Sequence, residues 1–331
     1  MDPADDSTAC TDSLRVHAFR ALAPGPRLVV LGAVHGNETC GTRAITQVLS
    51  ELDSGALVLQ RGSVSFVPVT NPLAYRKQQR MGERNLNRNL YPNTTPQDYE
   101  DRIANVLCPL LAEHDVLLDL HSFHTAGEPF VMVGPPDNTG ALEPFAHAAA
   151  EQALALRLGP RRIVEGWLET YAEGVMRRLE RTAPSERAHL LSTDPRYGVG
   201  TTEYMRSRGG YGVTLECGQH DDPRAPQVGY QAIRHCLAHL RMVEDAAPAA
   251  TADIELLRLT QVVDKYHGGD HFARAWASYD RVGQAELIGT RDDGSTVLAP
   301  HDGYIVFPNP AAVAGNEWFY FARRSTRDLG A

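Results

Sequence analysis

Apolar runs that end in glycine or a polar residue recur along residues 27–243 and constrain the fold of this chain most strongly. RLVVLGAV (27–34), SVSFVPV (63–69), DVLLDLH (115–121) and GYGVTLECG (210–218) are typical of buried strands. The segments between them have helical spacing of apolar residues, at 39–52, 103–114, 141–157 and 226–243. Strands that alternate with helices predict an α/β fold, with a mostly parallel or mixed sheet flanked by helices.

The pattern changes beyond residue 243. Residues 244–253 (EDAAPAATAD) are rich in alanine and lack periodicity, which is typical of a linker. Beyond them, short segments such as IELLRLTQVV and EWFYFA are separated by Gly, Asp and Pro, which predicts a small β-rich sandwich or half-barrel. We therefore expect a larger domain over 1–243, a linker over 244–253 and a β-rich C-terminal domain over 254–331.

Charge and composition argue against several classes of function. A net charge of −9 and a pI near 5.8 disfavour non-specific binding to nucleic acid or to an anionic membrane. The opening MDPADDSTACTDS is not a signal peptide, and no apolar run reaches the roughly 18–20 residues that span a bilayer. The five cysteines are odd in number and lack CxxC spacing, so we expect free thiols and a cytoplasmic location. A homo-oligomer is compatible with these features.

LGAVHGNETCG (31–41) places His35 and Glu38 on a glycine-flanked corner just after the first apolar strand. The carboxyl edge of the sheet is where open α/β folds gather ligands. Gly36 would let the backbone turn so that the two side chains converge on one point. Because this spacing also arises by chance, a capped loop with a solvated glutamate is the alternative.

A third candidate ligand, His121, ends the strand DVLLDLH. Two imidazoles and one carboxylate form the catalytic zinc set that leaves a fourth position for water, which predicts one zinc ion per chain. Asp119 lies on the same strand face and could orient or flank the site. His124 is a rival ligand in the following loop, and an ordinary hydrogen-bonded histidine at a strand end is the alternative for His121.

Two further features suggest chemistry. Glu216 lies inside the apolar strand VTLECG, and a buried carboxylate is either paired or functional. A zinc hydrolase needs a general base, so Glu216 is the candidate and a structural ion pair is the alternative. Residues 71–92 hold five basic residues, which in an acidic protein indicate an anionic ligand, although a solvated charged segment is the alternative for some of them.

HGNE, NLNR, DLH and ECG occur in this order, and together they resemble the aspartoacylase and succinylglutamate desuccinylase family. That family is related to zinc carboxypeptidases, and the resemblance covers residues 27–220, with a β-rich tail that also suits it. The resemblance implies a carboxypeptidase-like fold in which residues 1–243 form the catalytic domain. It implies His35, Glu38 and His121 as zinc ligands and Glu216 as the base that activates water.

The same resemblance implies substrate-binding residues. Asn87 and Arg88 would hold the substrate and polarise its carbonyl, and Arg80 would bind the α-carboxylate. Arg206 would bind a second carboxylate, with Arg208 as an alternative. Tyr320 would line the pocket from the C-terminal domain. This chain departs from the family's DLNR at its first residue, Asn85, and residues 160–200, which match no pattern, could shape the acyl pocket.

The expected activity is zinc-dependent hydrolysis of the amide bond of a small, anionic N-acyl amino acid. The acyl group, acetyl or succinyl, and the amino acid stay open. Two alternatives stay open as well: a zinc carboxypeptidase that acts on peptides, and a catalytically inert binding module that keeps the fold.

Overall fold

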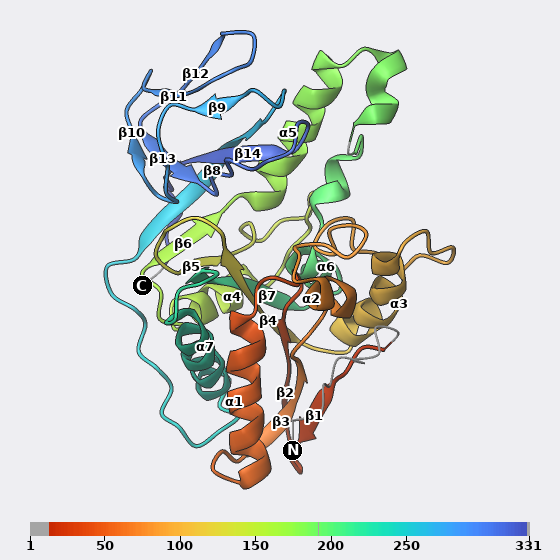
Figure 1. Ribbon diagram of the computed structural model, residues 1–331. Coiled ribbons are helices and arrows are strands. Elements are labelled where there is room, and N and C mark those ends of the chain that lie inside the picture. Colours follow the sequence, from red (N-terminus) through yellow and green to blue (C-terminus); the bar gives the residue numbers. More distant parts are fainter. Residues whose placement is uncertain (1–12, 191, 330–331) are drawn as a thin grey trace, which may run out of the picture.

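The computed structural model describes residues 13–190 and 192–329, and a large mixed sheet runs through it (Figure 1). The sheet has eleven strands in the order β1-β3-β2-β4-β7-β5-β6-β8-β14-β13-β10. A second sheet has three strands in the order β12-β11-β9. The predicted α/β fold, with a mixed sheet and helices beside it, is confirmed.

The parallel core of the large sheet consists of β3 (Arg61–Val67), β2 (Ala23–Gly32), β4 (Val116–Phe123) and β7 (Tyr211–Gln219). At its edge, β1 (His17–Arg20) runs antiparallel to β3. Every residue of β4 is buried, because helices cover both faces of this core. Since the core strands run in one direction, their carboxyl ends meet at one edge of the sheet.

Alternate side chains of β2 face two different helical layers. Leu28 and Val30 belong to a core cluster that lies under the first layer, and Val29 and Leu31 belong to a second cluster under the other layer. The first layer comprises α1 (Cys40–Ser54), α4 (Ala148–Ala155) and α7 (Ala225–His239). The second comprises α2 (Pro72–Lys77), α3 (Tyr99–Ala112) and α6 (Thr201–Ser207). Figure 1 shows α1 and α7 on the opposite side of the parallel core from α3.

The C-terminal strands extend the same sheet. β6 (Arg162–Glu165) pairs in parallel with β8 (Glu255–Asp264), and β14 (Glu317–Arg324) runs antiparallel to β8. The smaller sheet packs on this extension, where Trp318 stacks on Phe272 with 4.4 Å between ring centroids. The remaining strands are β5 (Phe130–Met132), β9 (His271–Phe272), β10 (Arg281–Val282), β11 (Leu287–Thr290), β12 (Thr296–Leu298) and β13 (Gly303–Val306).

The β-rich C-terminal segment was expected to form a sandwich or half-barrel of its own. Instead, its strand β8 pairs with the edge of β6, so the segment continues the large sheet. Residues 244–253 contain no helix or strand in the described structure. The division of the chain at this segment stays a prediction.

Two segments between the parallel strands differ from a simple helical pattern. The helix expected over 141–157 begins only at Ala148, since Pro144 disfavours a helical conformation at Glu143 and Phe145 pairs with Asn138 in an isolated bridge. The unmatched residues 160–200 form β6, α5 (Trp167–Arg181) and two short 3-10 helices, η1 (Pro184–His189) and η2 (Pro195–Gly198).

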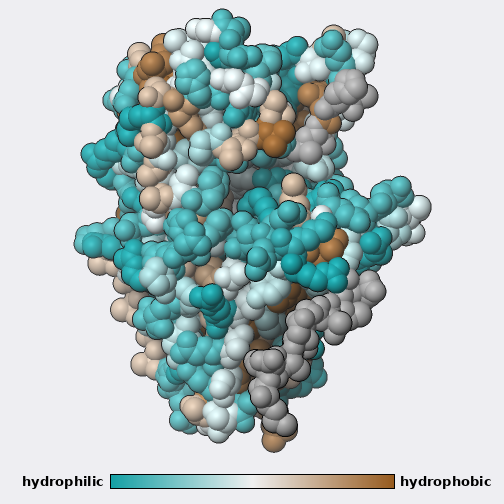
Figure 2. Space-filling model, in the orientation of Figure 1, coloured by the Kyte–Doolittle hydropathy of each residue, from teal (hydrophilic) through white to brown (hydrophobic). Residues whose placement is uncertain are grey.

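The outer surface is mainly polar. Hydrophilic residues cover most of the face shown in Figure 2, and apolar residues lie scattered among them. No helix within the described ranges is both long enough and apolar enough to cross a membrane.

The corner after β2 brings His35 and Glu38 together. The left-handed backbone residue there is Ala33, with a φ of 47°, and not Gly36. A Cβ atom at Gly36 would overlap the main chain of Ala74, at the middle of α2. Gly36 is therefore required because it lets α2 approach the corner closely, and the turn itself does not depend on its conformational freedom.

We expect Gly36→Ala to destabilise the protein by about 1–3 kcal/mol or more, because the added methyl group forces apart two main-chain segments that carry the site. Urea denaturation would measure the change. Gly268→Ala is the matched control, since a Cβ there would meet no atom within 4 Å. Equal stability of the two variants would contradict the close-approach explanation.

Candidate metal centre and active site

His35, Glu38 and His121 meet at the carboxyl edge of β2 and β4. Their ligand atoms all lie within 4.8 Å of one another, and the three residues are buried. Glu38 sits between the two rings, with Oε1 2.9 Å from His35 Nδ1 and Oε2 2.9 Å from His121 Nδ1. The main-chain N–H of Ser122 also donates to Glu38 Oε2, at 3.1 Å. Two imidazole nitrogens and one carboxylate form a donor set that can hold a metal ion and leave a position open.

A second side chain contacts the far nitrogen of each ring. His35 Nε2 lies 3.0 Å from Asn85 Oδ1, which also accepts the N–H of Asn87 at 2.9 Å. His121 Nε2 lies 2.9 Å from Asp119 Oδ2, although the angle is not that of a hydrogen bond. A contact to the ring nitrogen that faces away from the metal orients the ring of a metal-binding histidine. Here, the contacts with Asn85 and Asp119 leave both Nδ1 atoms facing Glu38. Asn85, the residue that departs from the family motif, thus has a contact that sequence reasoning missed.

The charges of this cluster favour a bound cation. Burial lowers the pKa of His35 to about 4. Burial also opposes the negative charge of Glu38, but the two histidines outweigh it and hold the Glu38 pKa well below its usual range. Burial opposes the positive charge of His121, but Asp119 and Glu38 outweigh it and raise the His121 pKa well above its usual range. A buried Glu38 carboxylate that is held ionised suits a divalent cation, so these residues fit a metal ion.

Glu216 lies beside the cluster because β7 pairs with β4 in a register that aligns Glu216 with His121. Its side chain faces the same cavity as Thr214, whereas Val213 and Leu215 face the core on the other side of the sheet. Glu216 Oε2 is buried and has no hydrogen-bond partner among the described residues. Burial raises the pKa of Glu216 to about 8, and His121 opposes the rise. A carboxylate in this position can accept and return a proton.

Arg80 contacts the same cluster. Its Nη1 donates to Glu38 Oε1 at 3.0 Å, and about half of the side chain is exposed. The guanidinium therefore lies next to the candidate metal cluster and is partly accessible to solvent. His124, the rival ligand, lies outside the cluster, where its Nε2 is 3.1 Å from the carbonyl oxygen of Pro308.

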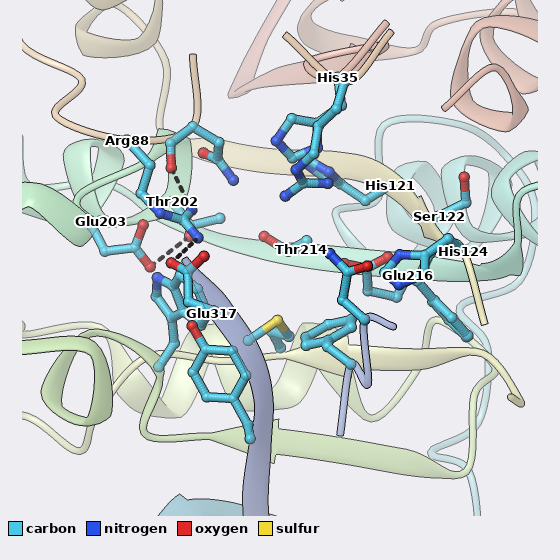
Figure 3. Close-up of a pocket in the computed structure, with 18 of the residues that line it drawn as sticks. His35, Arg88, His121, Ser122, His124, Thr202, Glu203, Thr214, Glu216 and Glu317 are labelled. Atoms are coloured by element: carbon cyan, nitrogen blue, oxygen red, sulfur yellow. Dashed lines mark hydrogen bonds and ion pairs between the residues drawn. The ribbon is translucent and has the colours of Figure 1, made fainter. Parts of the chain in front are cut away.

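Arg88 lies in another part of the cavity, next to Glu317 (Figure 3). Its guanidinium stacks on Trp167, 4.7 Å from the ring centroid, and donates to Glu317 Oε1 at 3.4 Å. Burial opposes the charge of Arg88, but Glu317 outweighs it and raises the Arg88 pKa. Asn87 also lines the cavity, and its Oδ1 accepts the N–H of Thr201 at 2.9 Å. A buried guanidinium with one long side-chain contact can accept a carboxylate as a further partner.

Arg206 lines the cavity too, but its donors are already engaged. Its Nε and Nη2 contact the carboxylate of Glu151 at 2.8 and 3.2 Å. Its Nη1 contacts Glu143 at 2.7 Å and Glu203 at 3.5 Å. Arg208, the alternative, is exposed and does not line the cavity. The assignment of Arg206 as a substrate ligand stays a prediction, and a substrate carboxylate would compete there with three glutamates.

The cavity that joins these side chains has a volume of about 180 Å³. Tyr320 lines it, and the buried hydroxyl of this residue has no hydrogen-bond partner among the described residues. The C-terminal region supplies one wall, made of Phe307, Asn309, Glu317 and Tyr320. Sequence reasoning missed Glu317 and did not single out Trp167, although Trp167 lies in the segment 160–200 that was expected to shape the pocket. The only signal for Glu317 is its place at the start of the apolar segment EWFYFA, and Trp167 belongs to no recognised motif.

Solved structures of other proteins share the fold of this chain. One solved structure with the same fold is a succinylglutamate desuccinylase/aspartoacylase from Rhodobacter sphaeroides (18% identity, TM-score 0.68). The matched region covers 94% of this chain and 90% of the Rhodobacter chain. A second is product-bound EutE (DoeB), an ectoine utilization protein from Ruegeria pomeroyi (19% identity, TM-score 0.66). Here the matched region covers 93% of this chain and 88% of the EutE chain. A third is an aspartoacylase family protein from Mesorhizobium loti (20% identity, TM-score 0.64), for which the matched region covers 95% of this chain and 90% of the Mesorhizobium chain.

A search of curated protein sequences finds no match. The family model of the succinylglutamate desuccinylase/aspartoacylase catalytic domain, by contrast, matches residues 24–240. That range contains both strand ends that carry the metal cluster and the strand that carries Glu216. The chain therefore belongs to the succinylglutamate desuccinylase/aspartoacylase family.

Proposed function

We propose that this protein is a zinc-dependent deacylase that hydrolyses the amide bond of a small N-acyl amino acid. The observation that carries the proposal is the placement of the buried carboxylate of Glu216, which is aligned with His121 in the sheet and faces the same cavity. A donor set of His35, Glu38 and His121 suits zinc in a catalytic site. Membership of the family supports the deacylase class.

In the proposed reaction, zinc and Glu216 have different roles. When bound, zinc supplies Lewis acidity, which polarises a carbonyl group and makes water more acidic. Glu216 takes a proton from the attacking water and then gives that proton to the leaving amine nitrogen. The burial that raises the Glu216 pKa makes the carboxylate a stronger base than an exposed glutamate.

The contacts favour an exchange of the roles that resemblance assigned to two arginines. Arg80 touches Glu38, a metal ligand, so we assign it to the carbonyl oxygen, where negative charge develops. Arg88 lies beside Glu317 in another part of the cavity, so we assign it, with Asn87, to the α-carboxylate. The two arginines then bind groups that every N-acyl amino acid has.

The wall from the C-terminal region favours a small substrate over a peptide. Phe307, Asn309 and Tyr320 close one side of a cavity of about 180 Å³. A carboxypeptidase has to leave room for a chain on the acyl side of the scissile bond. Whether the acyl group is acetyl or succinyl is open, and a panel of both series would decide it.

For the metal, we expect His121→Ala to lose zinc and keep its fold, because the variant removes one of three donors from a preformed strand end. Elemental analysis and circular dichroism would measure the two properties. His271→Ala, which removes an exposed imidazole, should keep its zinc. A full complement of zinc in His121→Ala would remove this residue from the ligand set.

A smaller effect is expected at Asn85. Asn85→Ala should lower zinc affinity by about 10–100-fold, because the ring of His35 loses the acceptor at its far nitrogen. Asn85→Asp keeps an acceptor oxygen at that place and should recover most of the affinity. Competition with a chromogenic chelator would give both values. Unchanged affinity in Asn85→Ala would show that the contact does not orient the ring.

For the reaction, Glu216→Gln should bind zinc normally and lose about 10²–10⁴-fold in kcat, the range for removal of a general base. The assay would use N-acetyl and N-succinyl amino acids, with an N-blocked dipeptide included. Glu173→Gln, on the exposed surface of α5, is the control and should behave as wild type. Turnover of the dipeptide alone would favour a carboxypeptidase, and no turnover of any substrate by the zinc-loaded wild type would favour a binding module.

A further inference from the structure

The segment that follows β14 contacts the strands that border the cavity. Arg327 in this segment is largely buried, with 11% of its side chain exposed, whereas the side chain of Arg324 is 71% exposed. Nη1 of Arg327 donates to the carbonyl oxygen of Gly134 at 2.8 Å and to Glu165 Oε2 at 3.1 Å. One nitrogen of this side chain therefore joins two separate segments of the chain.

The two contacted residues lie at strand ends. β5 ends two residues before Gly134, and β6 ends at Glu165. The two strands pair in parallel, and Val133 continues the pairing by donating its N–H to the carbonyl oxygen of Val164 at 2.9 Å. Arg327 therefore holds the carboxyl ends of two neighbouring strands.

Both strand ends lead into the wall of the cavity. Val133 lines the cavity next to Gly134, and Trp167 lines it two residues after Glu165. Trp167 also stacks on Arg88, which we assign to the α-carboxylate of the substrate. The position of the two strand ends therefore helps to set where the guanidinium of Arg88 meets a substrate.

The surroundings offer few substitutes for the two contacts of Arg327. Gly134 and Glu165 are both buried, and a buried acceptor that loses its donor costs free energy. Glu165 also accepts from Ser325 Oγ at 2.6 Å, and Arg258 lies farther away, at 3.6 Å. Removal of the Arg327 guanidinium should therefore loosen both strand ends.

We propose that Arg327 is a positioning residue for substrate binding, which acts by holding the ends of β5 and β6 and, through them, Val133 and Trp167. It lies outside residues 24–240, which the family model matches, so membership of the family assigns it no role. Its side chain donates to strand ends and not to the metal cluster or Glu216, so its effect falls on binding. The part of the proposal that concerns substrate rests on the deacylase function proposed above.

Hydrogen exchange followed by mass spectrometry tests the positioning without a substrate. In Arg327→Ala we expect faster exchange in peptides that cover residues 133–140 and 165–170, since a strand end that loses a contact opens more often. Peptides from β2 and β4 should exchange as in wild type. Arg324→Ala, which removes an exposed arginine, is the matched control and should match wild type throughout. Wild-type exchange at both wall segments in Arg327→Ala would overturn the proposal.

Ser325→Ala is a milder variant, which tests the same contacts if Arg327→Ala does not fold. The hydroxyl of Ser325 donates to Glu165 and also accepts the main-chain N–H of Arg327 at 3.0 Å. Its removal should accelerate exchange at residues 165–170 and, to a smaller extent, at 133–140. Wild-type exchange at 165–170 in this variant would overturn the role of the C-terminal segment at β6.

Kinetics of the zinc-loaded protein test the effect on binding. For the N-acetyl or N-succinyl amino acid that wild type cleaves best, Arg327→Ala should raise KM about tenfold and keep kcat within about threefold, because a displaced binding group costs affinity. Arg327→Lys should recover most of the wild-type KM, since one ammonium group can make both contacts of Nη1. The zinc content of both variants should equal that of wild type.

The outcomes separate this proposal from the proposed function. A fall in kcat at unchanged KM in Arg327→Ala would overturn the assignment of Arg327 to binding and leave the deacylase function standing. If wild type cleaves no N-acyl amino acid, the deacylase function is refuted. Hydrogen exchange then decides by itself whether Arg327 positions the wall of the cavity.

Discussion

The parallel pairing of β2, β4 and β7 is the constraint on which the rest of the site depends. Main-chain hydrogen bonds hold Leu31 beside Asp119 and His121 beside Glu216, so three strand ends arrive at one edge in a fixed register. A shift of one residue in this pairing would turn every side chain of a strand to the opposite face. Both faces are covered by apolar helices, which gives the register a large energetic preference.

Buried charge is the second determinant of the arrangement. Glu38 carries a negative charge away from water, between two imidazoles and next to Arg80. Such a charge is stable only where partners or a cation compensate it. The same principle separates the arginines of the cavity. Arg206 is compensated by three glutamates of the protein, whereas Arg88 has one long contact with Glu317 and can accept a substrate group.

The sequence predicted the parallel strands and the convergence of His35, Glu38 and His121, because both depend on local patterns. Apolar runs identify the strands. His121 lies near the carboxyl end of β4, and His35 and Glu38 lie in the turn that follows β2. Contacts between distant segments leave no such pattern. Asn85 meets His35 across fifty positions of the chain, and Glu317 meets Arg88 across more than two hundred. The pairing of β6 with β8 was missed for the same reason, since the sequence of a strand does not indicate which strand it pairs with.

We expect one metal ion to bind where these strand ends meet, next to Glu216. Anomalous diffraction from zinc-loaded crystals, recorded on both sides of the zinc absorption edge, tests it most directly. We expect a single peak per chain, within bonding distance of His35, Glu38 and His121. A peak at other histidines, such as His124 and His220, or no peak at the cluster, would contradict it.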